Sequence, residues 1–240
     1  MLLRQTRGIY LGMFLTACIL LAATLLFRPA ARSVFSPSAH ARPVVVIDAG
    51  HGGPDGGAVS NDGIIESRLN LEIARRLSLL LLFCGQDVSM TRTDDADCSL
   101  LPDTASIKNR KVADLKNRAA AVNSMENAVL LSIHQNSLAG HPGVYGAQAF
   151  FNAVPGSNGL AQSIQQALNQ AHNQGNAKNA RQIDSSIYLM SAVQHPAVLV
   201  ECGFLSNANE AHALCTAGYQ MQIVLSIAAG YLTYSNEGSA

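Results

Sequence analysis

Three apolar segments of this 240-residue chain each end at a residue whose side chain can bind a metal or move a proton. His51 follows the run VVVIDAG, His134 follows AVLLSI and Glu201 follows AVLV. Unbroken runs of β-branched and apolar residues are typical of strands that are buried on both faces of a parallel sheet. Because the carboxyl ends of such strands lie along one edge, we expect these three side chains to converge although they are distant in sequence.

A fourth candidate, Glu66, begins an amphipathic segment in which Leu69, Ile73, Leu77 and Leu80 recur at helical spacing. A helix that follows the first strand must begin where that strand ends, so Glu66 returns to the same edge. Two histidines and one glutamate with an open position for water form a known catalytic zinc arrangement. The other glutamate can then accept a proton from the water that zinc activates. This pattern predicts hydrolysis of an amide, and it leaves open which glutamate is the ligand and which is the base.

The elements that must position these residues alternate between strands and helices. Strands are predicted over 44–47, 86–92, 128–133, 147–152, 187–190 and 197–200, and helices over 66–83, 114–123, 158–171, 208–214 and 219–234. Asp114 and Asn207 are the expected N-caps of two of these helices. Residues 93–113 are expected to form a surface loop, and 174–184 a mobile polar segment at the surface. The alternation predicts an α/β fold, a single domain with a twisted, mainly parallel sheet flanked by helices on both faces.

An N-terminal hydrophobic helix is expected to precede this domain. Residues 8–27 are uncharged and mostly apolar between Arg7 and Arg28, which is long enough to cross a bilayer. A cleavable signal peptide is the alternative, because Ala39-His40-Ala41 has the A-x-A form, although it lies far beyond the apolar run. We therefore divide the chain into a transmembrane signal-anchor (1–28), a linker (29–43), a catalytic domain (44–234) and a tail (235–240). The expected location is the cell membrane, crossed once with the domain on the extracytoplasmic side, or secretion if the signal is cleaved.

The charge pattern argues against nucleic acid as a partner. The chain has 16 basic and 16 acidic residues, and five arginines precede the first acidic residue, Asp48. From residue 43 onward 11 basic residues therefore face 16 acidic ones, a net charge of about −5, with no basic patch. The five cysteines include no C-x-x-C pair, which argues against a cysteine zinc site. Burial as small apolar residues is favoured for each over a Cys84–Cys98 or Cys202–Cys215 disulfide.

Six segments carry a resemblance to a known family. They are IDAGHGGPDGGA (47–58), GIIESRLNLEIARRL (63–77), the SMTR–D run (89–94), LKNRAAAVN (115–123), LLSIHQN (130–136) and PAVLVECGFLSN (196–207). In this order, and over almost all of 44–234, the chain resembles the zinc-dependent N-acetylmuramoyl-L-alanine amidases of bacteria. The resemblance implies that His51, Glu66 and His134 bind one zinc ion per chain and that Glu201 is the catalytic carboxylate. It also implies that the substrate is peptidoglycan, cut between N-acetylmuramic acid and L-alanine.

Finer features of the resemblance concern biological role and control. SIHQNS, the GAQ-F run (146–150) and VECGFLSN resemble the sporulation branch, whose members trim stem peptides during synthesis of the spore cortex. Some family members carry a long insertion whose helix plugs the zinc site until an activator moves it. Here Pro155-Gly156-Ser157 leads directly into the next helix. We therefore expect no built-in plug, and a need for a helper protein stays open.

Two alternative functions remain at this point. A zinc carboxypeptidase acting on wall peptides would need a basic residue to hold a terminal carboxylate, and Arg92, Arg118 and Arg181 are available. A non-catalytic wall-binding domain would be expected to lack one of the four candidate residues, all of which are present.

Four further residues near the candidates have two interpretations each. Asp48 could orient His51 or serve as an ordinary aspartate at a strand end. Asn136 could contact substrate, although turn chemistry is favoured. Arg118 and Arg181 match positions that are common in the family, and a structural role is favoured for both over a functional one. Alternation along the third buried strand points Cys202 away from the site, which argues against a cysteine nucleophile.

Overall fold

The structure, a computed structural model, describes residues 42–237 and has an α/β fold. Its strands are β1 (Val44–Ala49), β2 (Val88–Met90), β3 (Ala128–Asn136), β4 (Gln148–Phe151), β5 (Arg181–Gln182) and β6 (Ala197–Phe204). They form one sheet in the order β2-β1-β3-β6-β4-β5, in which only the β4–β6 pairing is antiparallel. The predicted α/β class with a mainly parallel sheet is confirmed.

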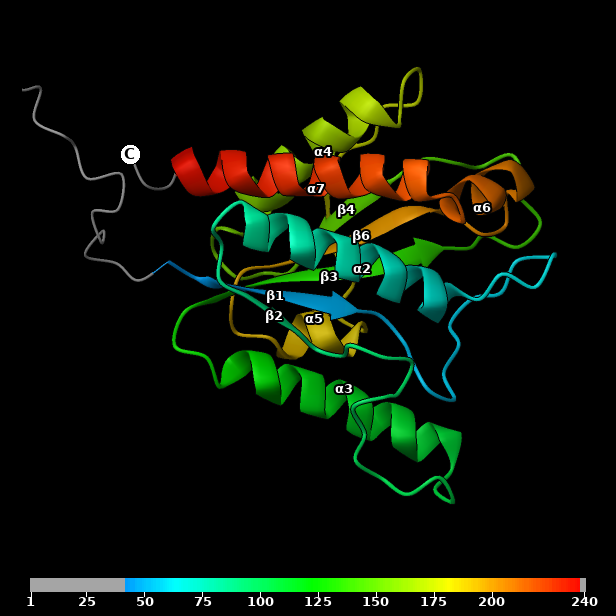
Figure 1. The fold of residues 1–240 in the computed structure, drawn as a ribbon, viewed down its shortest axis with the longest axis vertical. Helices are drawn as coiled ribbons and strands as arrows, with labels where there is room; N and C mark the ends of the chain where they lie inside the picture. Colours follow the sequence, from blue (N-terminus) through cyan, green and yellow to red (C-terminus); the bar gives the residue numbers. More distant parts are fainter. Residues whose placement is uncertain (1–41, 238–240) are drawn as a thin grey trace, which may run out of the picture. The chain divides into compact units, whose positions relative to one another are not determined.

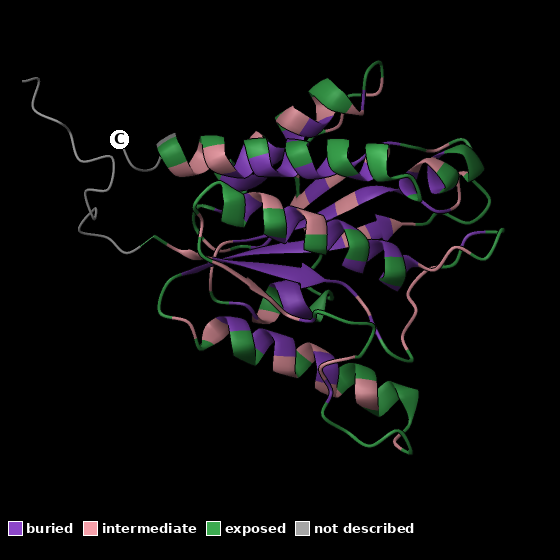
Figure 2. Ribbon diagram, in the orientation of Figure 1, coloured by how far each residue is buried: buried purple, intermediate pink, exposed green. Residues whose placement is uncertain are grey.

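Helices cover both faces of this sheet (Figure 1). On one face lie α2 (Glu66–Phe83), α4 (Ser157–Ala171) and α7 (Ala217–Glu237), and on the other lie α3 (Ile107–Asn123) and α5 (Tyr188–Ala192). The short helix α6 (Ala208–Leu214) follows β6. Figure 2 shows the central strands buried along their length, while the helices are buried only on the sides that meet the sheet or each other.

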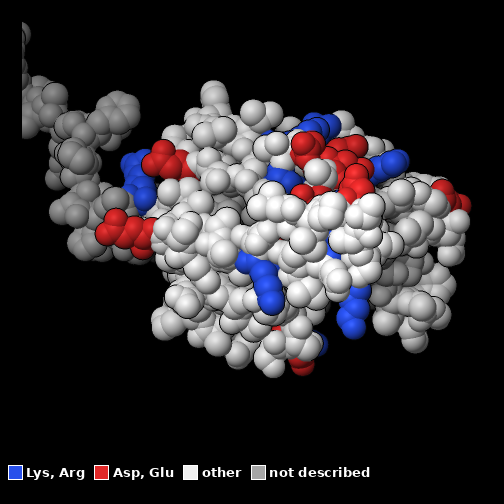
Figure 3. All heavy atoms as spheres, turned by 90° about the horizontal axis from the view of Figure 1, so that it is seen from below, with Lys and Arg blue, Asp and Glu red and all other residues white. Residues whose placement is uncertain are grey.

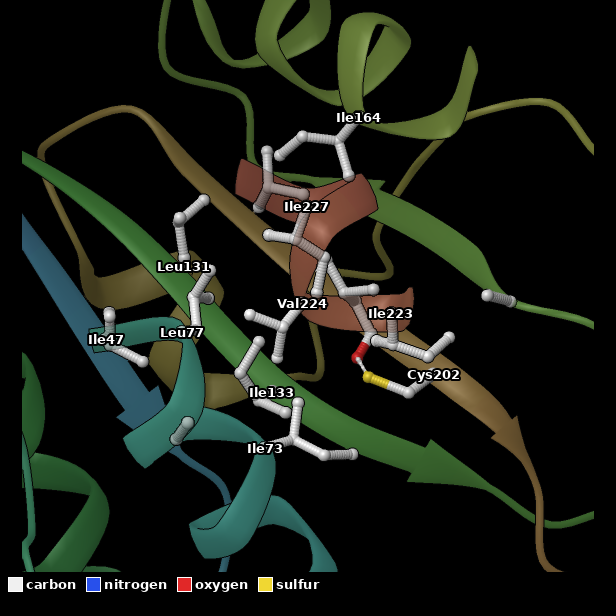
Figure 4. Packing of buried hydrophobic residues seen from close by; sticks show 14 of the residues in the cluster. Ile47, Ile73, Leu77, Leu131, Ile133, Ile164, Cys202, Ile223, Val224 and Ile227 are labelled. Carbon is white, nitrogen blue, oxygen red and sulfur yellow. Dashed lines mark hydrogen bonds between the residues drawn. The ribbon is translucent and has the colours of Figure 1, made fainter. Parts of the chain in front are cut away.

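Alternation along β1 separates the two cores. Val45 and Ile47 pack in the larger apolar cluster with α2, α4 and α7, whereas Val46 packs in the smaller cluster with α3 and α5. Figure 4 shows how Ile47 and Leu131 of the sheet meet Leu77 in the larger cluster. Since side chains of a strand point alternately to opposite faces, the residues that share the parity of Val46 face α3. The same rule places the side chains of Asp48, His134 and Glu201 on that face.

The start of α2 is tied to the strand ends by the backbone. The Glu66 amide donates to the carbonyl of Ala58 over 2.9 Å, and the Ser67 amide donates to the carbonyl of Gly56 over 3.0 Å. The helix ends at Phe83, and Gly85 adopts a φ of 75°, as expected for a glycine that stops a helix. The predicted bounds of this helix are confirmed, so Glu66 lies in its first turn.

Several predicted elements differ from the structure. Helix α3 begins at Ile107, where the Ser106 hydroxyl caps it by accepting from the amide of Asn109, so the prediction of Asp114 as N-cap was wrong. The predicted strand over 187–190 is helix α5, because a short apolar run does not distinguish a strand from a buried helical turn. The polar segment 174–184 contains the short strand β5. Asn207 does cap α6 as predicted, accepting from the amide of Glu210.

The expected signal-anchor and nearly all of the linker lie outside the described residues, as do residues 238–240, whereas 235–237 continue α7 rather than forming a tail. Within residues 42–237, no single helix has the length and apolar composition needed to cross a membrane. Only the pair Ala208–Leu214 and Ala217–Asn236, bent by 82°, meets that criterion when taken together.

The four described cysteines are free thiols. Cys202 lies fully buried in the larger apolar cluster (Figure 4). It therefore lies on the face of the sheet opposite Glu201, as alternation along β6 predicted. Cys84 and Cys215 are exposed, so the expectation that every cysteine is buried was wrong for these two. Each follows the last residue of a helix, where an exposed turn leaves no core to fill.

Candidate metal centre

His51, Glu66 and His134 converge at the carboxyl edge of the sheet. One atom of each, a histidine ring nitrogen or a carboxylate oxygen, lies within 4.8 Å of the other two. The Oε1 atom of Glu66 lies 3.0 Å from Nδ1 of His134 and 3.3 Å from Nε2 of His51. The two imidazole rings meet edge to face, with centroids 5.0 Å apart. The predicted convergence of a strand end, a helix start and a second strand end is thus present.

The backbone turn after β1 aims His51 at this group. His51 has a φ of 61°, in the left-handed region that non-glycine residues seldom adopt, and the glycine at 52 follows with a φ of 134°. Such conformations persist where surrounding contacts hold them, and they cluster at functional sites. The contact that holds the ring is a hydrogen bond of 2.9 Å between Nδ1 of His51 and Oδ2 of Asp55. Asp55 also pairs with Lys111 over 2.9 Å.

Within residues 42–237, the ring of His51 is held by Asp55 and not by Asp48, whose carboxylate instead anchors the end of β1. The Asp48 carboxylate accepts from Arg118 over 2.7 Å and from the hydroxyl of Ser132 over 2.6 Å. Burial acts to raise the pKa of Asp48, but Arg118 and Ser132 outweigh it and hold the pKa at about 2. Arg118 also pairs with Asp114 and donates to the carbonyl of His51 over 2.7 Å. Arg118 therefore has contacts that fit the structural role expected for it.

Glu66 is almost completely buried and is held as a carboxylate. Its oxygens accept hydrogen bonds from the amides of Ala58 and Gln135 and from the side chain of Asn70. Burial acts to raise the pKa of Glu66, but hydrogen bonds with His134 and His51 outweigh it, and the pKa falls far below its usual range. A buried anion that is fixed in orientation in this way is suited to bind a cation.

Burial favours the neutral form of the His51 ring, but its hydrogen bonds to Asp55 and Glu66 outweigh this and raise its pKa to about 9. Both ring nitrogens face carboxylate oxygens, and only the charged ring can donate at both. A metal ion needs a free lone pair on one nitrogen, so it would take the place of one of these protons.

Two glycines leave the space that the three side chains occupy. A Cβ atom on Gly50 would lie 2.3 Å from the ring of His134, and one on Gly57 would lie 2.5 Å from Oε2 of Glu66 and 2.8 Å from the ring of His51. No other residue type fits these positions without moving a candidate ligand. The backbone around the group is therefore shaped to its side chains.

Glu201 stands beside the group without belonging to it. It pairs with His134 in the register of β3 and β6, so the two side chains are neighbours on the same face of the sheet. Its Oε2 atom is buried and has no hydrogen-bond partner among residues 42–237. Burial, with a smaller contribution from Glu66, raises the pKa of Glu201 to about 7, against the opposing effect of His134. A buried carboxylate oxygen without a partner next to three candidate ligands is available for proton transfer.

The donor set fits a zinc ion. Two imidazole nitrogens and one carboxylate oxygen match the ligands of catalytic zinc sites, which keep a further position open. The unpartnered oxygen of Glu201 and the cradle formed by Gly50 and Gly57 both agree with a group bound between these side chains. Three features of the site thus agree with a bound zinc ion: the types of the three donor atoms, the space left by Gly50 and Gly57, and the unpartnered carboxylate oxygen of Glu201.

Asp55 is the site residue that the sequence analysis missed. It lies in the segment HGGPDGG, where proline, aspartate and glycine together are typical of a turn, and this turn chemistry masked its contact with His51. The only available signal was its position four residues after a candidate metal ligand, inside a segment rich in glycine.

Comparisons with known proteins agree with this geometry. Residues 45–232 match the profile of a family described as N-acetylmuramoyl-L-alanine amidase. The germination-specific N-acetylmuramoyl-L-alanine amidase of Bacillus subtilis is 37% identical over 196 residues, which cover 81% of this chain and 80% of that protein. The structure of the CwlD amidase from Clostridioides difficile in complex with the GerS lipoprotein superimposes with a TM-score of 0.77 at 32% identity, covering 82% of this chain and 100% of that one. An N-acetylmuramoyl-L-alanine amidase from Clostridium difficile 630 gives a TM-score of 0.68 at 29% identity, covering 81% and 97%.

Proposed function

This chain belongs to the N-acetylmuramoyl-L-alanine amidase family, and we propose that His51, Glu66 and His134 hold one zinc ion that serves this activity. The reaction is the hydrolysis, in peptidoglycan, of the amide bond between N-acetylmuramic acid and L-alanine. The observation that carries the proposal is the convergence of the three donor atoms within 4.8 Å of one another beside the unpartnered Glu201.

In this proposal Glu201 is the catalytic carboxylate. When bound, zinc would polarise the scissile carbonyl and lower the pKa of water to about 7. Glu201, whose pKa is raised to about 7, accepts a proton from the attacking water at Oε2. It then returns that proton to the nitrogen of L-alanine as the amide bond breaks, which makes the amine a better leaving group. Asp55 keeps the ring of His51 in place during these steps, and Arg118 holds the turn that carries it.

Substitution of single residues separates the ligands from the base. Glu66→Ala and His134→Ala are expected to lose both zinc and activity, whereas Glu201→Gln is expected to keep zinc and lose activity. The measurement is zinc content by atomic absorption beside turnover on purified peptidoglycan. Turnover by zinc-loaded Glu201→Gln at the wild-type rate would remove Glu201 from its role.

Product analysis tests the reaction itself against its two alternatives. The amidase leaves muramic acid with a free lactyl carboxylate and releases peptides that begin with L-alanine. A zinc carboxypeptidase would release single amino acids from the other end of the stem peptide. A non-catalytic wall-binding domain would bind peptidoglycan and release nothing.

We propose that this reaction serves maturation of the spore cortex. The proposal is supported by 37% identity to an amidase named as germination-specific. Cells that lack the protein are expected to form spores whose cortex retains stem peptides on muramic acid. Spores with an unchanged proportion of stem-free muramic acid would argue for a role in growing cells instead.

We propose further that the domain is anchored outside the cell membrane by residues 1–28. The support is the length and composition of the apolar run 8–27, which lies outside the described residues. Fractionation of cells that express the full chain is expected to place it in the membrane pellet and to leave it accessible to external protease. Recovery of a shortened chain in the medium would indicate cleavage of a signal peptide.

The domain is also proposed to be active without displacement of a plug. Only residues 152–156 connect β4 to α4, which is too short for an inserted helix. The CwlD amidase structure contains a lipoprotein, so a helper protein for this chain is the alternative. A zinc-loaded domain that cleaves peptidoglycan by itself supports the proposal, and a domain that stays inert until such a partner is added contradicts it.

A further inference from the structure

A cleft of about 690 Å³ opens beside the candidate metal centre, on the face of the sheet that α3 covers. His51, His134 and Glu201 line one part of it. Side chains of α3 form one wall, and the segment 181–189 forms another. Because His51, His134 and Glu201 lie in the same cleft as this segment, a substrate bound at the metal centre would extend along it.

The strand register builds the floor of this cleft in a defined order. Leu199 precedes Glu201 by two residues in β6, so both side chains point to the same face. Leu199 pairs with Phe150 of β4, and Phe150 pairs with Arg181 of β5. All four residues line the cleft. The floor of the cleft therefore begins at the carboxylate of Glu201 beside the metal centre and ends at the guanidinium of Arg181. The apolar side chains of Leu199 and Phe150 lie between these two charged groups.

Among the described residues, Arg181 differs from Arg118 and Lys111, the other cations that line the cleft, in having no ion-pair partner. Arg118 is paired with Asp48, and Lys111 is paired with Asp55. Arg181 is exposed and forms no ion pair or side-chain hydrogen bond within residues 42–237. Arg92 lies outside the cleft lining, and its guanidinium donates hydrogen bonds to backbone carbonyls, among them those of Ala49 and Gly50.

Figure 3 shows the surface from the side of α3, where basic side chains lie apart from one another and acidic ones gather in one area. Within the described part of the chain, Arg181 offers one unpaired guanidinium to the cleft, because Arg118 and Lys111 are paired with carboxylates, so it would recognise a single carboxylate rather than a polyanion.

We propose that Arg181 binds the free carboxylate on the second residue of the stem peptide. This inference rests on the proposed amidase function, and it assigns the peptide arm of the substrate to the floor between Glu201 and Arg181. In peptidoglycan the residue after L-alanine is a glutamate linked through its side chain, so its α-carboxylate is free. A guanidinium binds such a group through two parallel hydrogen bonds.

The spacing agrees with this assignment. Neighbouring strands lie about 4.8 Å apart and residues rise about 3.3 Å along a strand, which puts the Cα atoms of Glu201 and Arg181 roughly 12 Å apart. Two residues of an extended peptide span at most about 7 Å. The rest of the separation is covered by the two long side chains, which approach the substrate from opposite ends. Leu199 and Phe150 lie between them, where they would contact the methyl group of L-alanine.

A matched pair of substrates tests the inference. One is a muramyl tetrapeptide with D-glutamate at the second position, and the other carries D-isoglutamine there, which replaces the free carboxylate with an amide. We expect the zinc-loaded wild-type protein to favour the acid. In Arg181→Gln, kcat/KM for the acid should fall about tenfold to a hundredfold, the range of a charge-assisted hydrogen bond, with little change for the amide. The fall in kcat/KM should come mainly from a higher KM, because the contact between Arg181 and the carboxylate is present both in the bound substrate and in the transition state.

Two further variants act as controls. Arg181→Lys keeps the charge but lacks the two-pronged geometry, so it should recover only part of the preference. Lys116→Gln removes one exposed positive charge from α3 outside the cleft lining and should keep the wild-type preference. Zinc content and circular dichroism equal to the wild type show that each variant is folded and loaded.

The possible outcomes separate this inference from the proposed function. Cleavage of both substrates at the lactyl–alanine bond, with equal efficiency in the wild type and in Arg181→Gln, overturns the inference and leaves the amidase function intact. An equal loss on both substrates in Arg181→Gln also overturns it, because the arginine would then contact another group. Release of single amino acids, or cleavage of neither substrate by zinc-loaded protein, contradicts the proposed function and the subsite with it.

Discussion

The Nδ1 atom of His51 lies 2.9 Å from Oδ2 of Asp55, four residues further along the same turn. This contact turns the other nitrogen, Nε2, toward Oε1 of Glu66 at 3.3 Å. In a neutral ring the proton on Nδ1 would be donated to Asp55, and Nε2 would keep its lone pair for a metal. The tautomer that leaves Nε2 free for the proposed zinc ion is thus favoured by Asp55, a residue outside the group of three candidate ligands.

Removal of the Asp55 carboxylate is expected to weaken zinc binding. Asp55→Asn should lower zinc affinity about tenfold to a hundredfold, the effect typical of partners that orient a metal-bound histidine. Competition with a chromogenic chelator measures this affinity. Asp103→Asn is the control, since the Asp103 side chain is 97% exposed and its one ion pair among residues 42–237 is with Arg110. Equal zinc affinity in Asp55→Asn and the wild type would show that the hydrogen bond does not orient the ring.

Substitution of Gly57 should displace two candidate ligands at once. Its Cβ would lie 2.5 Å from Oε2 of Glu66, and its φ of 71° adds strain for any other residue. Gly57→Ala is therefore expected to lose most bound zinc as well as stability. Gly63→Ala is a matched control, because Gly63 has a φ of 81° but no atom within 4 Å of its Cβ position. Both variants carry a conformational cost of about 1–2 kcal/mol, so a zinc deficit confined to Gly57→Ala isolates the clash.

Zinc binding should release protons near neutral pH. In the metal-free protein the pKa of His51 is raised to about 9, so its ring is charged at pH 7.5 and must lose a proton to bind zinc. Calorimetric titrations in buffers of different ionisation enthalpy are expected to show about one proton released per zinc. Zinc affinity should therefore rise with pH up to about 9. Release that is unchanged in Asp55→Asn would assign the proton to another group.

The same pKa shift predicts how pH affects the metal-free fold. The folded-state pKa of His51 is raised above its ordinary value of 6.5, so its charged form stabilises the folded state fully below that pH. This contribution is lost as pH rises through about 9. Urea denaturation of metal-free protein should show a decline in stability over this window, and Asp55→Asn should flatten it. A stability that rises between pH 6.5 and 9 by an amount dependent on His51 would contradict the prediction.

Loss of Arg118 is expected to destabilise the fold more than it changes the chemistry. Arg118→Met leaves Asp48 and Asp114 without their buried cation, and breaking a buried ion pair in this way costs about 3–5 kcal/mol. Urea unfolding measures the free energy of unfolding. Arg68→Met, at an exposed position of α2, should change it by less than about 0.5 kcal/mol. A loss below about 1 kcal/mol in Arg118→Met would mean that the network contributes little to stability.

Much of the fold could be predicted from local sequence patterns. The apolar run before His51 and the helical spacing after Glu66 predicted β1 and α2 with nearly their observed bounds, because both patterns follow directly from burial on a strand or a helix face. The start of α3 at Ile107, after the N-cap Ser106, was missed because the helix carries many charged and polar residues and buries little of its first two turns. The apolar run over 187–190 fits a strand or a helix equally well by pattern, and in the structure it is a helical turn whose Leu189 and Met190 pack in the smaller apolar cluster.

The sequence by itself determined the four candidate residues and the elements that carry them, since strand ends and a helix start are properties of short segments. Only the tertiary structure decided which side chains contact them. Asp55, rather than Asp48, forms the hydrogen bond that holds the ring of His51. Arg181 lines the cleft without an ion pair among the described residues, whereas Arg118 is paired with buried carboxylates. The physical reason is that hydrogen bonds and ion pairs form between residues brought together by chain folding. A turn such as HGGPDGG, or the pairing of β5 with β4, sets those distances in three dimensions and leaves little trace in the local pattern.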